Sequence, residues 1–183
     1  MIRVIGGAFK GRRLKLVPSP LVRPMPAKLK EALFNIIQNE VMGAFVLDGF
    51  AGTGSIGIEA LSRGAKKAVF IDEYYPAVKA IKANLAECSA EDRGRVIHKE
   101  FNRAVINLGK EKAGFDLIFL DPPYKLLDER NPLKVIKKRN VLKKGGLVIL
   151  RHFFKTVPDQ KYFTLVRAVT LGDDTLSFFQ FLS

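Results

Sequence analysis

The chain has 183 residues, of which 48% are hydrophobic and 27% charged, a composition typical of one soluble globular domain. No apolar stretch approaches the roughly 20 residues that cross a bilayer. The apolar run at the N-terminus is too short for a secretory signal, and the single cysteine, Cys88, excludes an internal disulfide. We therefore expect a cytoplasmic protein that does not enter a membrane.

Charge is the first feature that points to a partner. Lys and Arg number 31 against 18 acids, which gives a net charge of +13. No acid precedes Glu31 and none lies between Glu129 and Asp159, so the positive charge is segregated along the chain. Because a segregated positive field attracts a polyanion, nucleic acid is the favoured partner; an anionic membrane surface and plain solubility are the alternatives.

The first quarter of the chain predicts a hairpin, a connector and a helix. Two apolar runs around a Gly-Gly pair make residues 2–17 typical of a β-hairpin. Three prolines within 18–24 then form a stiff connector. A helix should begin at Pro26, a favoured first-turn residue, and end at Gly43. Its apolar face would consist of Leu29, Leu33, Ile36 and Ile37.

From residue 44 onward, strands and helices alternate. The tail after residue 161 predicts two further strands around a turn. We therefore expect an α/β fold, in which a mostly parallel sheet carries helices on both faces and is closed by an antiparallel hairpin. The earlier strands are predicted at 44–48, 67–72, 95–99, 115–121 and 145–151, with helices from Gly54 to Gly64, from Pro76, up to about Gly109 and after Pro132.

A glycine-rich turn follows the strand at 44–48. Gly52, Gly54 and Gly57 match the pattern G-x-G-x-x-G between a strand and a helix, and Asp72 ends the next strand. In nucleotide-binding folds such glycines let a ligand approach the backbone, and the acid binds ribose hydroxyls. A tight turn without a ligand, with Asp72 capping the next helix, would explain the same residues.

Asp48, at the end of the strand before these glycines, distinguishes between cofactors. A carboxylate there would repel the pyrophosphate of a nicotinamide cofactor. S-adenosylmethionine instead carries a sulfonium and an ammonium group, and an acid favours both. We therefore predict S-adenosylmethionine. Glu100 and Phe101, after the third strand, could contact its adenine; otherwise they are a solvated acid and a core aromatic.

The tetrapeptide Asp121-Pro122-Pro123-Tyr124 follows the fourth strand, at the sheet edge where ligands bind. It resembles the catalytic motif of the amino-methyltransferases, which methylate exocyclic nitrogens of bases. That resemblance implies that the Asp121 side chain and the Pro122 carbonyl accept hydrogen bonds from the target amine, while Tyr124 stacks on the extruded base. The lone pair of such an amine is delocalised, so acceptors that orient the nitrogen supply the chemistry it needs.

Nearly the whole chain is similar to the RsmD family, which methylates a guanine N2 amine of small-subunit ribosomal RNA. The similar segments are "RVIGGAFKGRRLKL", "KEALFNII", "DGFAGTGSIGIEALSRGA", "FDLIFLDPPY" and "LGDDTLSFF". The resemblance implies a Rossmann-like class I methyltransferase fold with a seven-stranded sheet. It divides the chain into an RNA-contacting hairpin extension and connector at 1–24 and a methyltransferase domain at 25–183.

The same resemblance assigns roles to individual residues. Cofactor contacts would come from Asp48, Phe50, Ala51, Gly52, Gly54, Asp72, Glu100 and Phe101, and RNA contacts from Lys10, Arg12, Arg13 and Arg23. Two departures stand out: the acid at Glu100 is usually aspartate in the family, and an acid common after the fifth strand is replaced by Arg151-His152. His98 and His152 lack the spacing of metal ligands, so no metal is expected.

The leading hypothesis is therefore a guanine-N2 methyltransferase. Its expected partner is ribosomal RNA within a small-subunit particle, and we expect a monomer. One alternative is an adenine-N6 methyltransferase of DNA or RNA, although a DNA enzyme would need a recognition region for which 183 residues leave no room. Another is a catalytically idle RNA-binding assembly factor, which the intact motifs disfavour. A nicotinamide oxidoreductase is disfavoured by Asp48.

Overall fold

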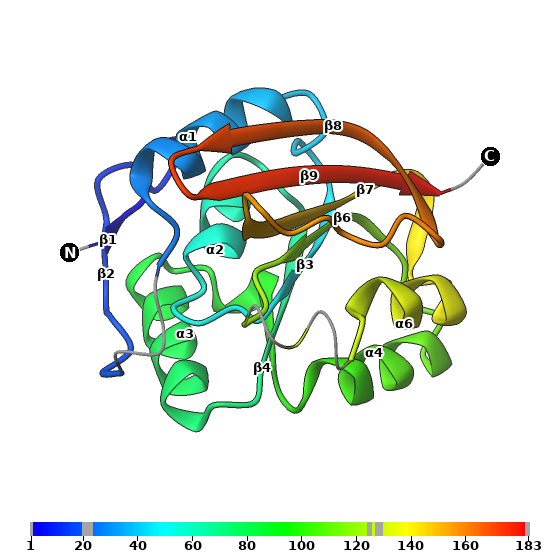
Figure 1. Cartoon of the computed structure of the whole chain (residues 1–183). Helices are drawn as coiled ribbons and strands as arrows, with labels where there is room; N and C mark the ends of the chain where they lie inside the picture. Colours follow the sequence, from blue (N-terminus) through cyan, green and yellow to red (C-terminus); the bar gives the residue numbers. More distant parts are fainter. Residues whose placement is uncertain (1, 20–23, 124–125, 127–129, 182–183) are drawn as a thin grey trace.

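The computed structural model describes residues 2–19, 24–123, 126 and 130–181 (Figure 1). Its centre is a seven-stranded sheet in the order β5-β4-β3-β6-β7-β9-β8. The first five strands in this order, β5, β4, β3, β6 and β7, are parallel to one another. Strand β9 lies between β7 and β8 and is antiparallel to both. Their bounds are β3 Phe45–Gly49, β4 Lys67–Asp72, β5 Gly94–His98, β6 Phe115–Leu120, β7 Leu142–Phe153, β8 Phe163–Leu171 and β9 Asp174–Phe181.

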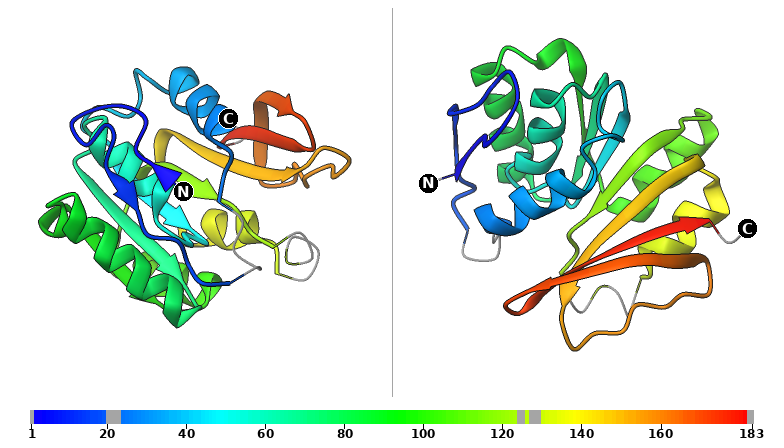
Figure 2. Two further views of the ribbon diagram at one scale, coloured as in Figure 1. Left: turned by 90° about the vertical axis from the view of Figure 1, so that its left-hand side faces the viewer. Right: turned by 90° about the horizontal axis from the view of Figure 1, so that it is seen from above.

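Helices cover both faces of this sheet (Figure 2). Successive side chains of a strand point to opposite faces, and both faces must be apolar where both are covered. Accordingly Val46 packs with α1, α2 and α3, while its neighbour Leu47 packs with α4 and α6. The helices are α1 Ala27–Ile36, α2 Ser55–Ser62, α3 Tyr75–Glu87, α4 Phe101–Lys110 and α6 Pro132–Arg139, with a short 3-10 turn at Glu91–Arg93. The predicted fold class is confirmed.

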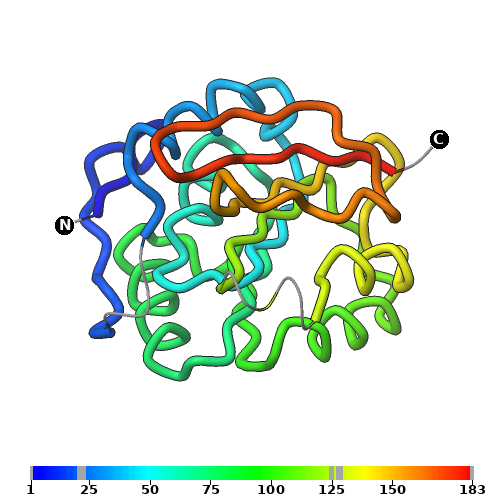
Figure 3. Tube along the Cα trace, in the orientation of Figure 1, coloured from blue at the N-terminus to red at the C-terminus, as the bar shows by residue number. Residues whose placement is uncertain are grey.

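The N-terminal hairpin is shorter than predicted. Only β1 (Ile2–Arg3) and β2 (Arg13–Leu14) form a ladder. The rest of the segment is held by polar side chains of α2 and α3, which run beside it (Figure 3). Glu59, which is 0% exposed, accepts hydrogen bonds from two backbone N–H groups of the hairpin at 2.9 and 2.8 Å. Backbone groups satisfied in this way need no partner strand, so the ladder stops early.

Two further predicted boundaries are wrong by three residues or more. The first helix ends at Ile36, not Gly43, and turn residues follow it. Strand β7 begins at Leu142, three residues before the Gly-Gly pair at which its start is predicted. Gly145 has φ 78°, and the ladder between β6 and β7 shifts register at this point, so the glycines form an irregularity within the strand. In the part of the chain that the structure describes, no helix is long and apolar enough to cross a membrane.

Candidate active site at the carboxyl ends of the strands

Three predicted acids come together at one edge and on one face of the sheet. Asp48 lies in β3 opposite Phe70 of β4 and Phe119 of β6. Asp72 comes two residues after Phe70, and Asp121 comes two residues after Phe119. Side chains two residues apart in a strand share a face, so all three carboxylates point to the side of α1, α2 and α3. The strand ends that the sequence predicts therefore meet as expected.

The glycine turn between β3 and α2 is tied to two of these acids. The backbone N–H of Gly57 donates to Asp48 Oδ2 at 2.8 Å, and that of Gly52 donates to Asp72 Oδ2 at 2.8 Å. Gly54, immediately before α2, has φ 75°, a left-handed conformation that glycine adopts without strain. The backbone of the turn is therefore bound to Asp48 and Asp72.

Asp48 is buried among other acids. It is 3% exposed, and burial raises its pKa to about 8. The Gly57 N–H lowers this pKa, whereas the neighbouring Asp121 and Asp72 raise it further. A buried carboxylate with two acidic neighbours is stabilised by a cation placed beside it. This charge arrangement fits the sulfonium and ammonium groups of S-adenosylmethionine.

Asp72 does not cap the following helix. The N-cap position of α3 is Tyr74, with no side-chain capping bond, and the Tyr74 N–H donates to Asp72 Oδ1 at 2.9 Å within the turn. Burial raises the pKa of Asp72, and the N–H groups of Tyr74 and Gly52 lower it. The backbone N–H of Glu73 also lowers this pKa, so Asp72 is held by the turn on both of its carboxylate oxygens.

Glu100 and Phe101 have structural roles next to a cavity. Glu100 caps α4, accepting hydrogen bonds from the N–H groups of Asn102 and Arg103 at 2.9 and 3.0 Å. Phe101 is buried and stacks on Phe50, with ring centroids 4.8 Å apart. The cavity, of about 510 Å³, is lined by Glu73, His98, Lys99, Glu100, Arg103, Ile106 and Asn107, most of which the sequence does not single out. Adenine contacts by Glu100 and Phe101 stay a prediction.

The tetrapeptide predicted to be catalytic begins where β6 ends. The Asp121 carboxylate is about a third exposed, Pro122 is buried and Pro123 is exposed. Within 2–19, 24–123, 126 and 130–181, no donor bonds to the Pro122 carbonyl, whereas the Pro123 carbonyl accepts from the Leu126 N–H at 2.9 Å. The Asp121 side chain and the Pro122 carbonyl can therefore act as acceptors. The predicted stacking residue, Tyr124, lies outside the described residues.

Sequence reasoning misses the contacts of two residues at this edge. Arg151 donates to Asp121 Oδ2 at 2.9 Å and forms a second ion pair with Asp174. In the sequence, Arg151 stands out only as a departure from the family pattern. Its neighbour His152 points to the other face, where it is buried and lies 2.8 Å from the Ser177 hydroxyl. The described residues contain no group of three or more side chains arranged to bind a metal.

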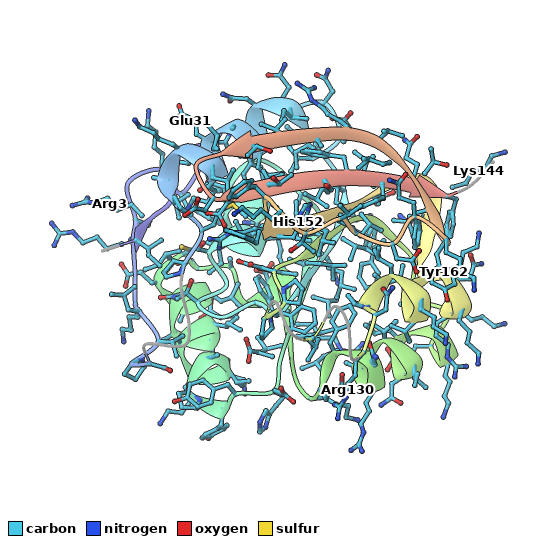
Figure 4. All side chains as sticks on the ribbon, in the orientation of Figure 1. Arg3, Glu31, Arg130, Lys144, His152 and Tyr162 are labelled. Atoms are coloured by element: carbon cyan, nitrogen blue, oxygen red, sulfur yellow. The ribbon has the colours of Figure 1, made fainter. Side chains whose placement is uncertain are left out.

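The basic residues predicted to contact RNA lie on the surface. Lys10, Arg12 and Arg13 are exposed, and Arg23 lies outside the described residues. Arg12 is 3.7 Å from Glu87, but both side chains are more than half exposed, so this ion pair is weak. Positive charge also occurs elsewhere: Figure 4 shows Arg3 and Lys144 projecting from opposite sides of the molecule.

Comparison with known proteins assigns the chain to a family. The family described as conserved hypothetical protein 95 matches residues 2–180. The chain is 32% identical to the ribosomal RNA small subunit methyltransferase D of Haemophilus influenzae over 174 residues, 93% of this chain and 89% of the relative. It is 38% identical to YlbH of Bacillus subtilis over 151 residues, 82% of either chain.

A solved structure agrees with the sequence relatives. That of yhhF from Escherichia coli superimposes with a TM-score of 0.85 at 27% identity, covering 98% of this chain and 97% of the other. The fold is thereby confirmed. S-adenosylmethionine as the methyl donor agrees with relatives that are named as methyltransferases. The chain belongs to the conserved hypothetical protein 95 family, the RsmD family of methyltransferases.

Proposed function

We propose that this protein transfers a methyl group from S-adenosylmethionine to the exocyclic N2 amine of a guanine in small-subunit ribosomal RNA. The observation that carries the proposal is the position of Asp121 beside Asp48, at the ends of the neighbouring strands β6 and β3. Asp121 would accept a hydrogen bond from the amine, and Asp48 would favour the cationic donor. The substrate is supported by the name of the Haemophilus relative, a ribosomal RNA small subunit methyltransferase.

Each end of the methyl donor has a matching group in this site. Asp48 would stabilise its positive charges, and Asp72 would accept from the ribose hydroxyls. The cavity next to Glu100 would receive the adenine. When bound, the donor supplies an electrophilic methyl group, so no cysteine is required; Cys88 is buried after α3, away from the acids.

The amine would be oriented by two acceptors. One N–H donates to the Asp121 carboxylate and the other to the Pro122 carbonyl, which turns the nitrogen lone pair away from the ring system and towards the methyl carbon. On taking the methyl group the amine nitrogen would become briefly cationic and would then release a proton to solvent. The Asp121 carboxylate stabilises that developing positive charge.

The exposed basic residues would hold the RNA. Lys10, Arg12 and Arg13 project from a hairpin that is hydrogen-bonded to the buried side chains of Glu59 in α2 and Asn84 in α3. Phosphate contacts there would therefore set the position of the RNA. Arg23, and stacking by Tyr124, belong to the same proposal by family resemblance. The proposal also includes a functional division of the chain at residue 24. It further includes a monomeric protein whose true substrate is a ribosomal particle.

The test uses small subunits that lack this methylation. They are incubated with labelled S-adenosylmethionine and the protein, in parallel with naked ribosomal RNA and DNA, and the nucleosides are analysed. N2-methylguanosine is expected, and the Asp121→Ala variant should make none while still binding S-adenosylmethionine. N6-methyladenosine as the product would overturn the choice of guanine, and no labelled nucleoside from any substrate would favour an idle assembly factor.

A further inference from the structure

The carboxylate of Asp121 is held by a buried arginine between two acids. Arg151 Nη1 lies 2.9 Å from Asp121 Oδ2. The same guanidinium makes two hydrogen bonds to Asp174, from Nε to Oδ1 at 3.0 Å and from Nη2 to Oδ2 at 3.2 Å. The Arg151 side chain is 10% exposed and that of Asp174 is 16% exposed. Three charged side chains therefore form one ordered array, Asp121–Arg151–Asp174.

The array follows from the pairing of three neighbouring strands. Leu120 lies opposite Leu150, so Asp121 and Arg151 come next to one another at the edge of the sheet. Arg151 lies opposite Leu176 in the antiparallel β9, and Asp174 is two residues from Leu176 on the same face. Such diagonal cross-strand neighbours are within reach of a long side chain. Strand β9 thus brings a residue from the end of the chain to the predicted catalytic acid.

Arginine constrains a carboxylate more tightly than lysine does. Its planar fork is already fixed by two bonds to Asp174, which leaves Nη1 in a set direction towards Asp121. Oδ2 of Asp121 is taken by this bond. No donor from the described part of the chain bonds to the other oxygen, Oδ1. Among the described residues, one oxygen of the acid is therefore anchored and the other has no donor, which leaves it open to a ligand.

The arginine also balances charge at this edge. The groups that face Asp121 are Arg151 from β7, Asp174 from β9 and Asp48 from β3. Burial raises the pKa of Asp121, Arg151 lowers it, and Asp174 raises it. Without Arg151, three acids would converge with no cation, and Asp121 would take up a proton more readily. A protonated Asp121 would be a weaker acceptor for an amine.

We propose that Arg151 and Asp174 are positioning residues for methyl transfer: Asp174 fixes the Arg151 guanidinium, and Arg151 turns the Asp121 carboxylate so that its free oxygen faces the amine of the base. The inference rests on the proposed role of Asp121 as the amine acceptor. Arg151 itself touches neither the base nor the methyl donor. The competing interpretation is that the array only joins β6, β7 and β9.

The experiment measures kcat, KM for RNA and the pH profile of kcat in four variants: Arg151→Gln, Arg151→Lys, Asp174→Asn and Asp121→Ala. Saturating S-adenosylmethionine is used, because the cationic donor keeps Asp48 ionised and removes its titration from kcat. The matched control is Arg95→Gln. Arg95 also makes two hydrogen bonds to one acid, Glu111, at 2.7 and 3.1 Å, but at the opposite end of the strands.

Arg151→Gln is expected to lower kcat roughly 10- to 100-fold, the loss typical of a misplaced reacting group. KM should change far less. The thermal midpoint should fall as well, because Asp121 and Asp174 lose their counter-ion, so kcat is measured well below it. The acid limb of its pH profile should move to higher pH, because Asp121 loses the cation that keeps it ionised. Arg151→Lys should keep the acid limb close to that of the wild type but still lose kcat, since the ammonium lacks the fork. Asp174→Asn should lower kcat less than Arg151→Gln does.

The outcomes separate this inference from the proposed function. If Asp121→Ala abolishes transfer but Arg151→Gln, Arg151→Lys and Asp174→Asn all match Arg95→Gln in kcat and pH profile, the inference alone is overturned. If Asp121→Ala transfers normally, the proposed role of Asp121 fails and the inference fails with it. Should Arg151→Gln not fold, Arg151→Lys and Asp174→Asn decide, and wild-type kcat in both would refute positioning.

Discussion

Asn84 of α3 donates a hydrogen bond to the carbonyl of Thr53 in the glycine turn, at 2.9 Å. The same buried amide accepts from the Lys15 N–H at 2.7 Å and donates to the Lys15 carbonyl at 3.1 Å. One side chain therefore joins the N-terminal segment to the glycine turn of the proposed cofactor site.

Asn84→Ala should destabilise both the fold and the cofactor site. The Lys15 and Thr53 backbone groups would lose their partner, and each buried polar group left without one costs about 1–3 kcal/mol. Urea denaturation should show a lower free energy of unfolding, and titration should show weaker S-adenosylmethionine binding. Asn35→Ala on the exposed face of α1 is the control. Equal effects of the two changes would contradict this role of Asn84.

Asp48 should make cofactor binding depend on pH. Its pKa of about 8 means that the acid is largely protonated at neutral pH before the cationic donor binds. Binding favours the ionised form, so affinity for S-adenosylmethionine should rise with pH, by up to about tenfold per unit, and level off above pH 8. Asp48→Asn should bind weakly with a flat pH dependence. An equally steep slope in Asp48→Asn would assign the titration to another group.

The same raised pKa makes Asp48 a cost to the free protein. The pKa of Asp48 is higher in the folded than in the unfolded chain, so ionising this acid costs the folded state free energy. The stability of the free protein should therefore fall as the pH rises from about 4 towards 8. Without cofactor, Asp48→Asn should therefore melt higher than the wild type at pH 9 and close to it at pH 4. A lower melting temperature at pH 9 would show that burial of the charge is already compensated.

Glu59 should be needed for the N-terminal segment to dock. It is fully buried, 3.3 Å from the buried Lys30 and 2.9 Å from Arg63. Glu59→Gln would leave Lys30 without its counter-ion, and breaking a buried pair in this way costs about 3–5 kcal/mol. Burial already lowers the pKa of Lys30, whereas Glu59 raises it, so the stability of the variant should recover as the pH rises and Lys30 loses its proton. Thermal melting between pH 7 and 10 measures this recovery.

The basic hairpin should set the salt dependence of RNA binding. Arg12→Ala with Arg13→Ala should weaken binding and reduce the slope of log affinity against log salt by about one unit for each arginine that binds a phosphate in the wild type. Lys138→Ala with Lys144→Ala removes the same charge from exposed positions at and beyond α6. Equal slopes for the two double variants would mean that attraction is spread over the surface and not centred on the hairpin.

Much of the fold could be predicted because its signals are local. Strand β4 has the predicted bounds, since an apolar run ends at a single acid, Asp72. The N-terminal ladder is shorter than predicted because its hydrogen bonds go to Glu59 and Asn84, which in the sequence look like ordinary polar residues of helices. Likewise the Gly-Gly pair at 145–146 has the composition of a turn, yet forms an irregularity that the flanking strand tolerates.

Only those parts of the site that do not depend on the order of strands in the sheet could be predicted from the sequence. Asp48, Asp72 and Asp121 follow parallel strands, and the carboxyl ends of such strands always share one edge. The contact of Arg151 with Asp121 depends on β6 pairing with β7, and its contact with Asp174 depends on β9 pairing with β7 in one particular register. Composition and periodicity specify neither pairing. For Phe101 the sequence does not distinguish two roles. A core aromatic and a residue that contacts the cofactor would both follow the third strand, and the structure shows Phe101 stacked on Phe50.

The ladder between β3 and β6 has a consequence for the kind of RNA this protein can use. Asp48 and Asp121 lie at the ends of two hydrogen-bonded strands, so the ladder fixes the separation of their backbones. Enzymes that act on a base must take it out of the stack to reach its reacting atom. If the proposed function holds, a guanine that is unpaired or easily swung out of its helix will be modified far faster than one locked in a stable stem.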